Sequence, residues 1–293
     1  MVNRLFGLLL LSLWPIAFAH ADTGITVRDD RGLVHHFAKP PKRVITLLPS
    51  LTESVCALDA CDRLVATDRY SDWPDAVRSL PKLGGIDDTP METVVTLKPD
   101  VVLAARSSRA IKRLEELGIP VVTLEPQSLR DVYTALDTLA TLLAAEPARD
   151  RVVAHLQQQL QEARARIPSA RLHQSVYLEV AEHRYAASQS SYLGQVLAQL
   201  GLRSVVPGDW GAFPAISWEW VLTHPPDLIM VDETELTHLQ HRPLSQTLRA
   251  LNHGSVCAFT SADFGVMARP GPRLGLTALR ISDCVARLPA PTP

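Results

Sequence analysis

The chain has 293 residues and a formal net charge of −2, with 20% charged and 46% hydrophobic residues. A net charge this close to zero does not favour binding to nucleic acid or to an anionic membrane surface, so neither is expected as a partner. The length exceeds what one hydrophobic core usually serves, which favours two lobes of roughly 100–150 residues each.

The first 21 residues have the pattern of a cleaved secretory signal. Arg4 supplies a positive charge, an apolar stretch runs from Leu5 to Phe18, and Ala19-His20-Ala21 is a small-x-small cleavage site. The apolar stretch is shorter than the ~20 residues that a transmembrane helix needs. No cysteine lies near the cleavage site. We therefore expect a soluble, monomeric protein that is exported to the periplasm.

Short strands and helices alternate through the first half of the chain. A hairpin is predicted at 25–37, and the apolar run from Arg43 to Leu48 predicts a strand that feeds a helix over 51–58, capped by Ser50 or Thr52. Further strands are predicted at 64–67, 101–104 and 121–124, and helices at 92–97 and 110–117. This alternation is typical of parallel β/α layers.

The middle of the chain is predicted to be helical over residues 129–145 and 147–167. The second stretch carries one apolar stripe, with Pro147 near its first turn and Pro168 just after its end. A helix of ~20 residues spans ~30 Å, which is about the size of a lobe. We therefore interpret it as a rigid connector.

The β/α pattern resumes after this helix. Strands are predicted at 175–180, 228–231 and 256–259, and helices at 192–200, 219–224, 245–251 and 273–288. The predicted organisation is a signal over 1–21, an N-terminal lobe over 22–146, a connecting helix over 147–168 and a C-terminal lobe over 169–293.

Four cysteines in an exported chain make disulfides plausible, and four cysteines allow three pairings. Cys56 and Cys61 close a small loop at the end of a predicted helix, while Cys257 begins a strand and Cys284 lies on the last helix. We favour Cys56–Cys61 and Cys257–Cys284 over the crossed pairings, and buried free thiols are the alternative.

One segment occurs twice, at 92–104 and 219–231, and each copy predicts a short helix, a Pro-Asp stop and an apolar strand. The aligned copies share Glu92/Glu219, Val94/Val221, Thr96/Thr223, Pro99/Pro226 and Asp100/Asp227. The alternative explanation is that such a Pro-Asp break between a helix and a strand is common in α/β proteins. It does not explain why each glutamate lies seven residues ahead of its proline. The repeat favours two similar lobes, each with an exposed glutamate, and a binding protein over an enzyme with one centre.

Aromatic residues form only 5% of the chain, yet several lie in predicted loops: Tyr70, Trp73, Tyr185, Trp210 and Phe213. Rings on loops are binding candidates, because a flat conjugated ligand gains both buried area and stacking. The alternative is that these rings pack against the hydrophobic core beneath the loops.

Other chemical signals are weak. His35-His36 and the pair His238 and His241 lack the third and fourth ligands of a zinc site, so neither a metal site nor a cofactor is expected. Serine-nucleophile and phosphate-loop motifs are absent from the sequence. An exported enzyme that acts through Asp263, Arg269 and a histidine is the less favoured alternative, because an enzyme has no reason to display paired glutamates.

The motifs together resemble the iron-chelate and vitamin B12 periplasmic-binding family over residues 42–288. The matching segments are Pro49-Ser50 with Thr52-Glu53, Ser71-Asp-Trp-Pro74, Lys82-Leu-Gly-Gly85, Leu97-Lys-Pro-Asp100, Leu117-Gly-Ile-Pro-Val121, and Ser217 with Glu219. The resemblance implies an α/β fold of two Rossmann-like lobes joined by one long backbone helix. It also implies a ligand held between the lobes and delivery to an ABC permease dimer with its ATPase. In that family an acidic residue on each lobe engages permease arginines, and Glu92 and Glu219 fall on those positions.

The ligand is less well determined. The vitamin B12-binding members line their cleft with rings, and Trp73, Tyr185 and Phe213 fall on or near those positions, while Asp263-Phe264 falls on an Asp-aromatic pair that binds the ligand. Two departures follow: Ala105 replaces a ring, and the tyrosine with which haem binders ligate iron is missing before Glu92. A corrinoid is therefore expected first and an iron–siderophore second.

Overall fold

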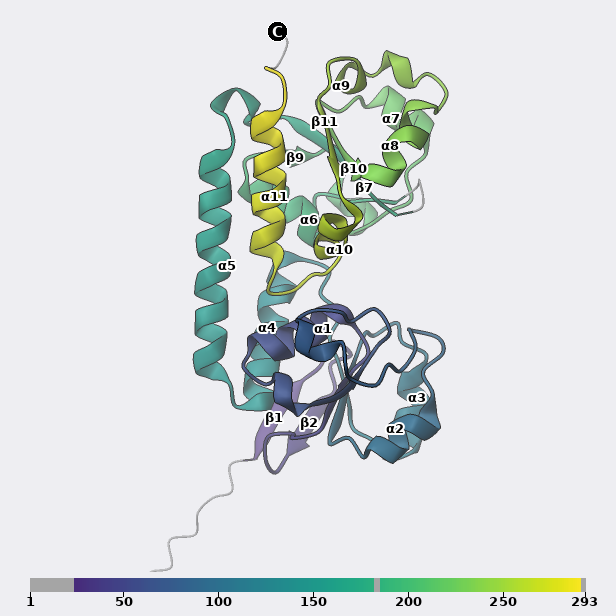
Figure 1. Cartoon of the computed structure of the whole chain (residues 1–293), viewed down its shortest axis with the longest axis vertical. Coiled ribbons are helices and arrows are strands. Elements are labelled where there is room, and N and C mark those ends of the chain that lie inside the picture. Colours follow the sequence, from purple (N-terminus) through teal and green to yellow (C-terminus); the bar gives the residue numbers. More distant parts are fainter. Residues whose placement is uncertain (1–23, 182–184, 291–293) are drawn as a thin grey trace, which may run out of the picture.

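The computed structural model describes residues 24–181 and 185–290, and the predicted signal over 1–21 lies outside them. The described residues form two α/β lobes arranged end to end, with one long helix along their side (Figure 1). A hairpin of β1, Ile25–Arg28, and β2, Val34–Phe37, packs at the outer end of the N-terminal lobe.

The N-terminal lobe is built on a parallel sheet of order β4-β3-β5-β6. The elements of this lobe are β3, Val44–Thr46; α1, Pro49–Ala57; β4, Leu64–Thr67; α2, Met91–Leu97; β5, Val101–Ala104; α3, Ala110–Glu116; and β6, Val121–Thr123. Alternate strand residues face opposite sides. Val101 and Leu103 pack in the core that contains α1, whereas Val102 and Ala104 pack in the core beneath α2 and α3. The predicted parallel β/α layers are thus confirmed.

The C-terminal lobe has a sheet of order β11-β10-β7-β8, with β9 also paired to β7. Its elements are β7, Ser175–Ala181; β8, Tyr185–Ala186; α6, Tyr192–Gln199; β9, Arg203–Ser204; α7, Trp218–Thr223; β10, Leu228–Asp232; α8, Glu233–Gln240; α9, Arg249–Asn252; β11, Val256–Phe259; α10, Ser261–Met267; and α11, Leu274–Arg287. Only β8 runs antiparallel to its neighbour among these described strands.

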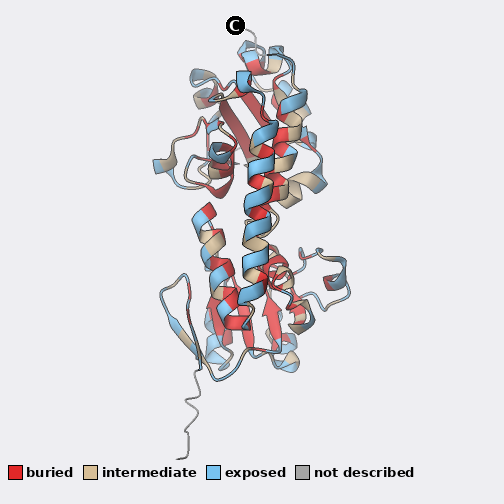
Figure 2. Cartoon of the chain, turned by 90° about the vertical axis from the view of Figure 1, so that its left-hand side faces the viewer, coloured by how far each residue is buried: buried red, intermediate tan, exposed pale blue. Residues whose placement is uncertain are grey.

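Two long helices bridge the lobes. The helix α5, Glu146–Arg166, contributes Ala148 to the N-terminal core and Leu156 and Leu160 to the C-terminal core. The preceding helix α4, Leu129–Leu143, does the same in reverse, with Leu129 in the C-terminal core and Leu139 in the N-terminal core. The outward face of α5 is exposed along its length (Figure 2). The connector predicted from the sequence is therefore confirmed as a helix, and α4 shares its role.

The predicted start of α1 was wrong. Pro49 occupies the first helical turn and Leu48 the cap position, so neither Ser50 nor Thr52 caps the helix. The Thr52 hydroxyl instead bonds to Thr46 Oγ1 at 2.6 Å and Ser71 Oγ at 2.7 Å. A proline in the first turn is favoured because its missing N–H would be unpaired there in any case.

Two further differences lie in the C-terminal lobe. The single helix expected at 245–251 is a 3-10 turn, Ser245–Thr247, followed by α9. The helices α8 and α10 were not predicted, because neither carries a clear apolar stripe: Leu239 and Met267 are the one buried side chain of each.

Both favoured disulfides are present. Cys56–Cys61 joins the last turn of α1 to the 3-10 turn Cys61–Arg63, and Cys257–Cys284 joins β11 to α11. Neither part of the described chain, 24–181 or 185–290, contains a helix with the length and apolar character needed to span a bilayer.

Candidate ligand-binding cleft

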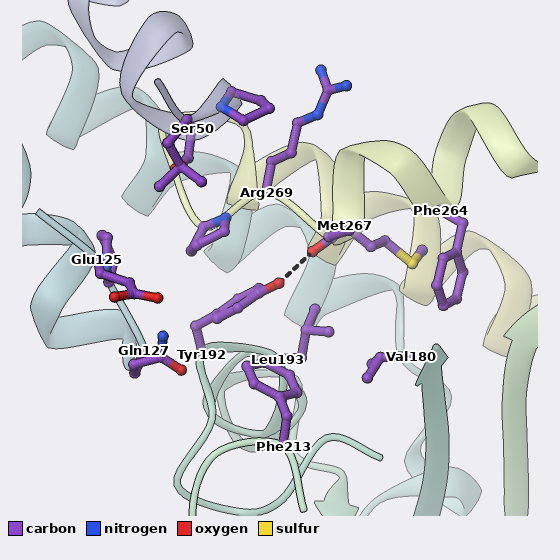
Figure 3. A pocket seen from close by; sticks show the side chains of 15 residues that line it. Ser50, Glu125, Gln127, Val180, Tyr192, Leu193, Phe213, Phe264, Met267 and Arg269 are labelled. Carbon is purple, nitrogen blue, oxygen red and sulfur yellow. Dashed lines mark hydrogen bonds between the residues drawn. The ribbon is translucent and has the colours of Figure 1, made fainter. Parts of the chain in front are cut away.

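A cavity of about 330 Å³ lies between the two lobes (Figure 3). It opens at the carboxyl ends of the parallel strands, where Leu48 follows β3, Glu125 follows β6 and Val180 lies at the carboxyl end of β7. Open α/β sheets bind their ligands at this edge. The complete lining is Leu48, Pro49, Ser50, Glu125, Pro126 and Gln127 from the N-terminal side and Val180, Tyr192, Leu193, Phe213, Phe264, Met267, Ala268, Arg269 and Pro270 from the C-terminal side.

The C-terminal wall of the cavity is aromatic and apolar. Tyr192 and Phe213 meet edge to face, with ring centroids 5.3 Å apart, and Phe264 and Met267 from α10 continue the wall (Figure 3). The Tyr192 hydroxyl donates to the Met267 carbonyl at 3.1 Å, and burial raises the pKa of this phenol well above its usual range. The wall therefore presents fixed ring surface to a flat ligand.

The N-terminal wall adds polar groups. The Glu125 carboxylate accepts hydrogen bonds from the Ser107 amide at 3.1 Å and hydroxyl at 3.0 Å. Ser50 is 2% exposed, and its hydroxyl has no hydrogen-bond partner among the described residues. A few polar groups against an apolar wall are the usual composition of a small-molecule site.

Only two of the expected ligand-binding residues, Phe213 and Phe264, line this cavity. Asp263 lies next to Phe264 on α10, but its carboxylate pairs with Arg280 at 3.1 Å. Tyr70, Trp73, Tyr185 and Trp210 are 61%, 37%, 42% and 46% exposed, and the structure does not bring them to the cavity.

Sequence reasoning missed Tyr192 and Met267. Tyr192 was assigned to the start of a helix, which is correct, but the first turn of α6 is also the part that faces the other lobe. The backbone amide of Tyr192 donates to the Gln127 carbonyl at 2.8 Å and so ties α6 to the N-terminal side. A ring at the start of a helix that follows a polar loop was the available signal.

Beside the cavity, a network that we name the inter-lobe clamp joins Glu53 and Asp72 of the N-terminal lobe to Arg269 and Arg273 of the C-terminal lobe. Glu53 accepts hydrogen bonds from Arg269 Nη1 at 3.0 Å and from Arg273 Nε at 2.8 Å, as well as from Arg273 Nη2. Asp72 accepts from Arg269 Nη1 at 2.6 Å. The Arg273 guanidinium lies 4.5 Å from the Trp73 ring centre.

The clamp holds the predicted Tyr70–Pro74 loop against the other lobe, because Arg269 Nη2 also donates to the Tyr70 carbonyl at 3.0 Å. Burial acts to raise the pKa of Asp72, but the hydrogen bond and charge of Arg269 outweigh it and lower the pKa overall. Figure 3 shows the Arg269 guanidinium pointing away from Tyr192, so only its stem contributes to the cavity wall. The sequence offered Thr52-Glu53 as part of the family motif but gave no sign of this role.

The repeated segment corresponds to α2–β5 in one lobe and α7–β10 in the other. Val94 and Val221 are completely buried in equivalent cores. The Thr96 hydroxyl donates to the Glu92 carbonyl at 2.9 Å, and the Thr223 hydroxyl donates to the Glu219 carbonyl at 3.2 Å.

The repeated aspartates also have equivalent partners. Asp100 accepts from the Arg43 amide at 2.9 Å, just before β3, and Asp227 accepts from the Ser175 amide at 2.8 Å, at the start of β7. Each aspartate thus ties the repeated strand to the first strand of its lobe's main sheet, β3 or β7. The repeated valines, threonines and aspartates are explained by folding alone.

Folding does not explain the repeated glutamates. Glu92 and Glu219 lie in the first turns of α2 and α7, are exposed, and have no ion-pair partner among the residues that the structure describes. Figure 1 shows α2 and α7 on the side of the two lobes that lies away from α5. Each lobe thus carries one exposed carboxylate at the equivalent point of the repeat. Over 24–181 and 185–290, no group of three or more His, Cys, Asp or Glu residues could hold a metal ion.

Two α/β lobes joined by two bridging helices, with an apolar cavity between them, are the architecture of a two-lobed ligand-binding protein. The chain matches the family model for periplasmic binding proteins over residues 44–262, and it belongs to that family.

Two relatives by sequence are an uncharacterised ABC transporter substrate-binding lipoprotein of Bacillus subtilis and a vitamin B12-binding protein of Pectobacterium atrosepticum. Each is 26% identical, over 85% of this chain and 82% and 90% of the relative. Among solved structures, the vitamin B12-binding protein of Vibrio cholerae (84% of this chain, 97% of that chain) and a haem-binding protein with two haems (84% and 100%) are each 23% identical, with TM-scores of 0.70 and 0.69. These structures establish the fold, which is that of class III periplasmic binding proteins.

Proposed function

We propose that the chain is the substrate-binding component of an ABC importer, which captures a corrinoid between its lobes and delivers it to a permease dimer with its ATPase. The observation that carries the proposal is the inter-lobe cavity with its aromatic wall, in a chain whose sequence relatives include vitamin B12-binding proteins. The protein acts by binding, without catalysis and without a resident cofactor.

The wall of Tyr192, Phe213, Phe264 and Met267 supports a ligand with a broad apolar face. A cavity of about 330 Å³ is at the small end of the ~300–1,000 Å³ usual for small-molecule sites. A corrinoid with its nucleotide loop is larger than that, so the cleft has to widen when it binds. An iron–siderophore is the second candidate, because only two of the expected rings line the cavity.

The proposed organisation follows the lobes. Residues 22–146 and 169–293 form the lobes around the connector 147–168, and the predicted signal over 1–21 directs the protein to the periplasm, where it acts as a monomer. Glu92 and Glu219 contact the permease, one on each lobe. Their matched positions suit a partner made of two symmetric subunits.

The test is a titration of the purified mature chain with cyanocobalamin, cobinamide, haemin and ferrichrome, followed by calorimetry. We expect saturable binding of cyanocobalamin with one site per chain and weaker binding of haemin. If only ferrichrome bound, the ligand would be an iron–siderophore and not a corrinoid. If none of the four compounds bound, the proposal would be contradicted.

A matched pair of variants locates the site. Phe213→Ala removes a ring from the cavity wall, and the loss of one ring contact should weaken binding by at least about 1 kcal/mol. Trp210→Ala removes an exposed ring outside the cavity and should leave affinity unchanged. If the Trp210 variant lost affinity and the Phe213 variant did not, the ligand would bind elsewhere.

A further inference from the structure

Ser50 leaves two hydrogen-bond donors unpaired in the wall of the cavity. It lines the cavity and is 2% exposed, and its hydroxyl has no partner among the described residues. Its backbone amide has none there either, whereas the amides of Leu51 and Thr52 both donate to the Leu48 carbonyl at 3.1 Å. Pro49, which begins α1, has no N–H to donate. Both donors of Ser50 therefore lie at the amino end of α1, a position that favours an oxygen acceptor.

The other two hydroxyl groups of α1 are paired. Ser54 Oγ donates to the Ser50 carbonyl at 2.7 Å. The Thr52 hydroxyl bonds to Thr46 and Ser71. Buried polar groups without a partner are rare in folded proteins, because each has lost its bond to water without a replacement. Folding therefore does not explain the hydroxyl of Ser50, which indicates a partner that the chain itself does not supply.

The same wall also offers a hydrogen-bond acceptor. Figure 3 shows Ser50 and Glu125 on the side of the cavity away from Phe264. The Glu125 side chain is half-buried, and its described hydrogen-bond donors, the amide and the hydroxyl of Ser107, are both neutral. Each oxygen of a carboxylate can accept more than one hydrogen bond. The N-terminal wall thus combines unpaired donors at Ser50 with a negatively charged acceptor at Glu125.

A primary carboxamide suits both residues, because its carbonyl oxygen accepts a hydrogen bond and its NH2 group donates. A carboxylate could accept from Ser50, but the charge of Glu125 would repel it. We infer that the N-terminal wall binds the carboxamide groups at the edge of a corrinoid, with a carbonyl oxygen on Ser50 and an NH2 group on Glu125, and discriminates against ring ligands with carboxylate edges. This inference rests on the proposed corrinoid function and adds what selects among ligands with similar rings.

Ser50 becomes accessible when the cleft widens. The segment between α10 and α11 covers it, since a side-chain carbon at Gly271 would lie 3.4 Å from the Ser50 carbonyl oxygen and 3.6 Å from its Cβ. A corrinoid requires the cleft to widen in any case, because the cavity is only about 330 Å³. A ligand carbonyl then pairs with two donors that had no partner before, and this gain favours the ligand-bound state.

The first experiment compares the heptaamide of dicyanocobyrinic acid with dicyanocobyrinic acid itself, which share the ring and the metal and differ only at the edge. Calorimetric titration of the purified mature chain should show that the heptaamide binds at least about tenfold more tightly. Glu125→Gln removes the charge that repels the acid and should reduce this preference at least about threefold. Equal affinities of the wild type for the two compounds, or an unchanged preference in Glu125→Gln, would refute the selection for carboxamides.

Ser50→Ala and Ser54→Ala are a matched pair, since each removes one buried hydroxyl from α1. Ser50→Ala should weaken binding of the heptaamide about 3- to 10-fold. It should leave Tm unchanged or higher, because the lost hydroxyl has no partner in the described part of the chain. Ser54→Ala should do the reverse: it should lower Tm, since its hydroxyl is bonded, and change the affinity less than about twofold.

The outcomes separate the inference from the function on which it rests. If the wild type binds neither cyanocobalamin nor the heptaamide, the corrinoid proposal fails and the inference fails with it. If the wild type binds cyanocobalamin but not the heptaamide, or if Ser50→Ala binds the heptaamide as tightly as the wild type does, the corrinoid function stands and the inference is refuted. Equal losses of affinity in Ser50→Ala and Ser54→Ala would also refute it, because the effect would then come from the packing of α1.

Discussion

The inter-lobe clamp gives the sharpest stability prediction. Glu53→Gln keeps the size of the side chain but removes its charge, while Arg269 and Arg273 remain. The Glu53 side chain is 1% exposed, and those of Arg269 and Arg273 are 17% and 15% exposed. The substitution therefore leaves two largely buried guanidinium groups with one carboxylate, that of Asp72, instead of two.

Breaking a buried ion pair by removing one partner usually costs about 3–5 kcal/mol. The arginines keep some contact with water, and Asp72 still pairs with Arg269, so the lower end of that range, about 3 kcal/mol, is expected here. For a chain of this size that corresponds to a fall in Tm of about 5–10 °C. Thermal unfolding followed by calorimetry measures it.

Asp72→Asn is the matched control, because it also removes one carboxylate from the clamp. The Asp72 side chain is 62% exposed, and exposed pairs contribute only about 0–1 kcal/mol. We expect a change in Tm of less than about 3 °C. Equal shifts in both variants, or no shift in Glu53→Gln, would show that burial does not set the strength of this network.

Three further predictions concern acid stability, docking and motion. Burial acts to raise the pKa of Asp29, but hydrogen bonds from His35, the Leu33 amide, Thr123 and Arg31 outweigh it and lower the pKa to about 2. The folded value lies below the unfolded one, so the stability due to Asp29 is complete above about pH 4 and is lost as the pH falls through 2; the gap in unfolding free energy between wild type and Asp29→Asn should shrink by about 2 kcal/mol between pH 5 and pH 2 in urea titrations. The double variant of Glu92 and Glu219 to alanine should retain ligand affinity and lose permease-dependent uptake, measured with labelled ligand in cells, and the reverse result would place the glutamates in the cleft. Because α4 and α5 both bridge the lobes, small-angle scattering should show a nearly constant radius of gyration on ligand binding, and a marked decrease would contradict a rigid connection.

The sequence predicted the parts of the fold that depend on local pattern. The strand at 101–104 and the long helix at 147–167 were found because each carries its own signal, an apolar run before a turn or a stripe between two prolines. The start of α1 was missed because Pro49 and Ser50 are both good N-terminal residues. In the structure Leu48 is the cap residue, and the Thr52 hydroxyl bonds to Thr46 and Ser71 instead of capping the helix.

The site was harder to predict because it depends on how the lobes meet. Phe213 and Phe264 were found by combining ring chemistry with family position. Trp210 satisfied the same ring criterion, yet it packs on Trp220 of its own lobe. Glu53 lay within a quoted motif, but its partners are more than 200 residues away along the chain. No local pattern encodes a contact of that separation.

Ligand entry and the rigid connection place opposite demands on the cleft. Two bridging helices restrict rotation of the lobes, whereas a cavity of about 330 Å³ has to widen for a corrinoid. The Tyr70–Pro74 loop meets the C-terminal lobe at its edge, where Arg269 bonds to the exposed Asp72 carboxylate and to the Tyr70 carbonyl and Arg273 lies over Trp73. The bonds between Glu53 and Arg273 involve no residue of that loop. We therefore expect the cleft to widen first at the edge with the exposed Asp72, while the buried Glu53 keeps the lobes joined.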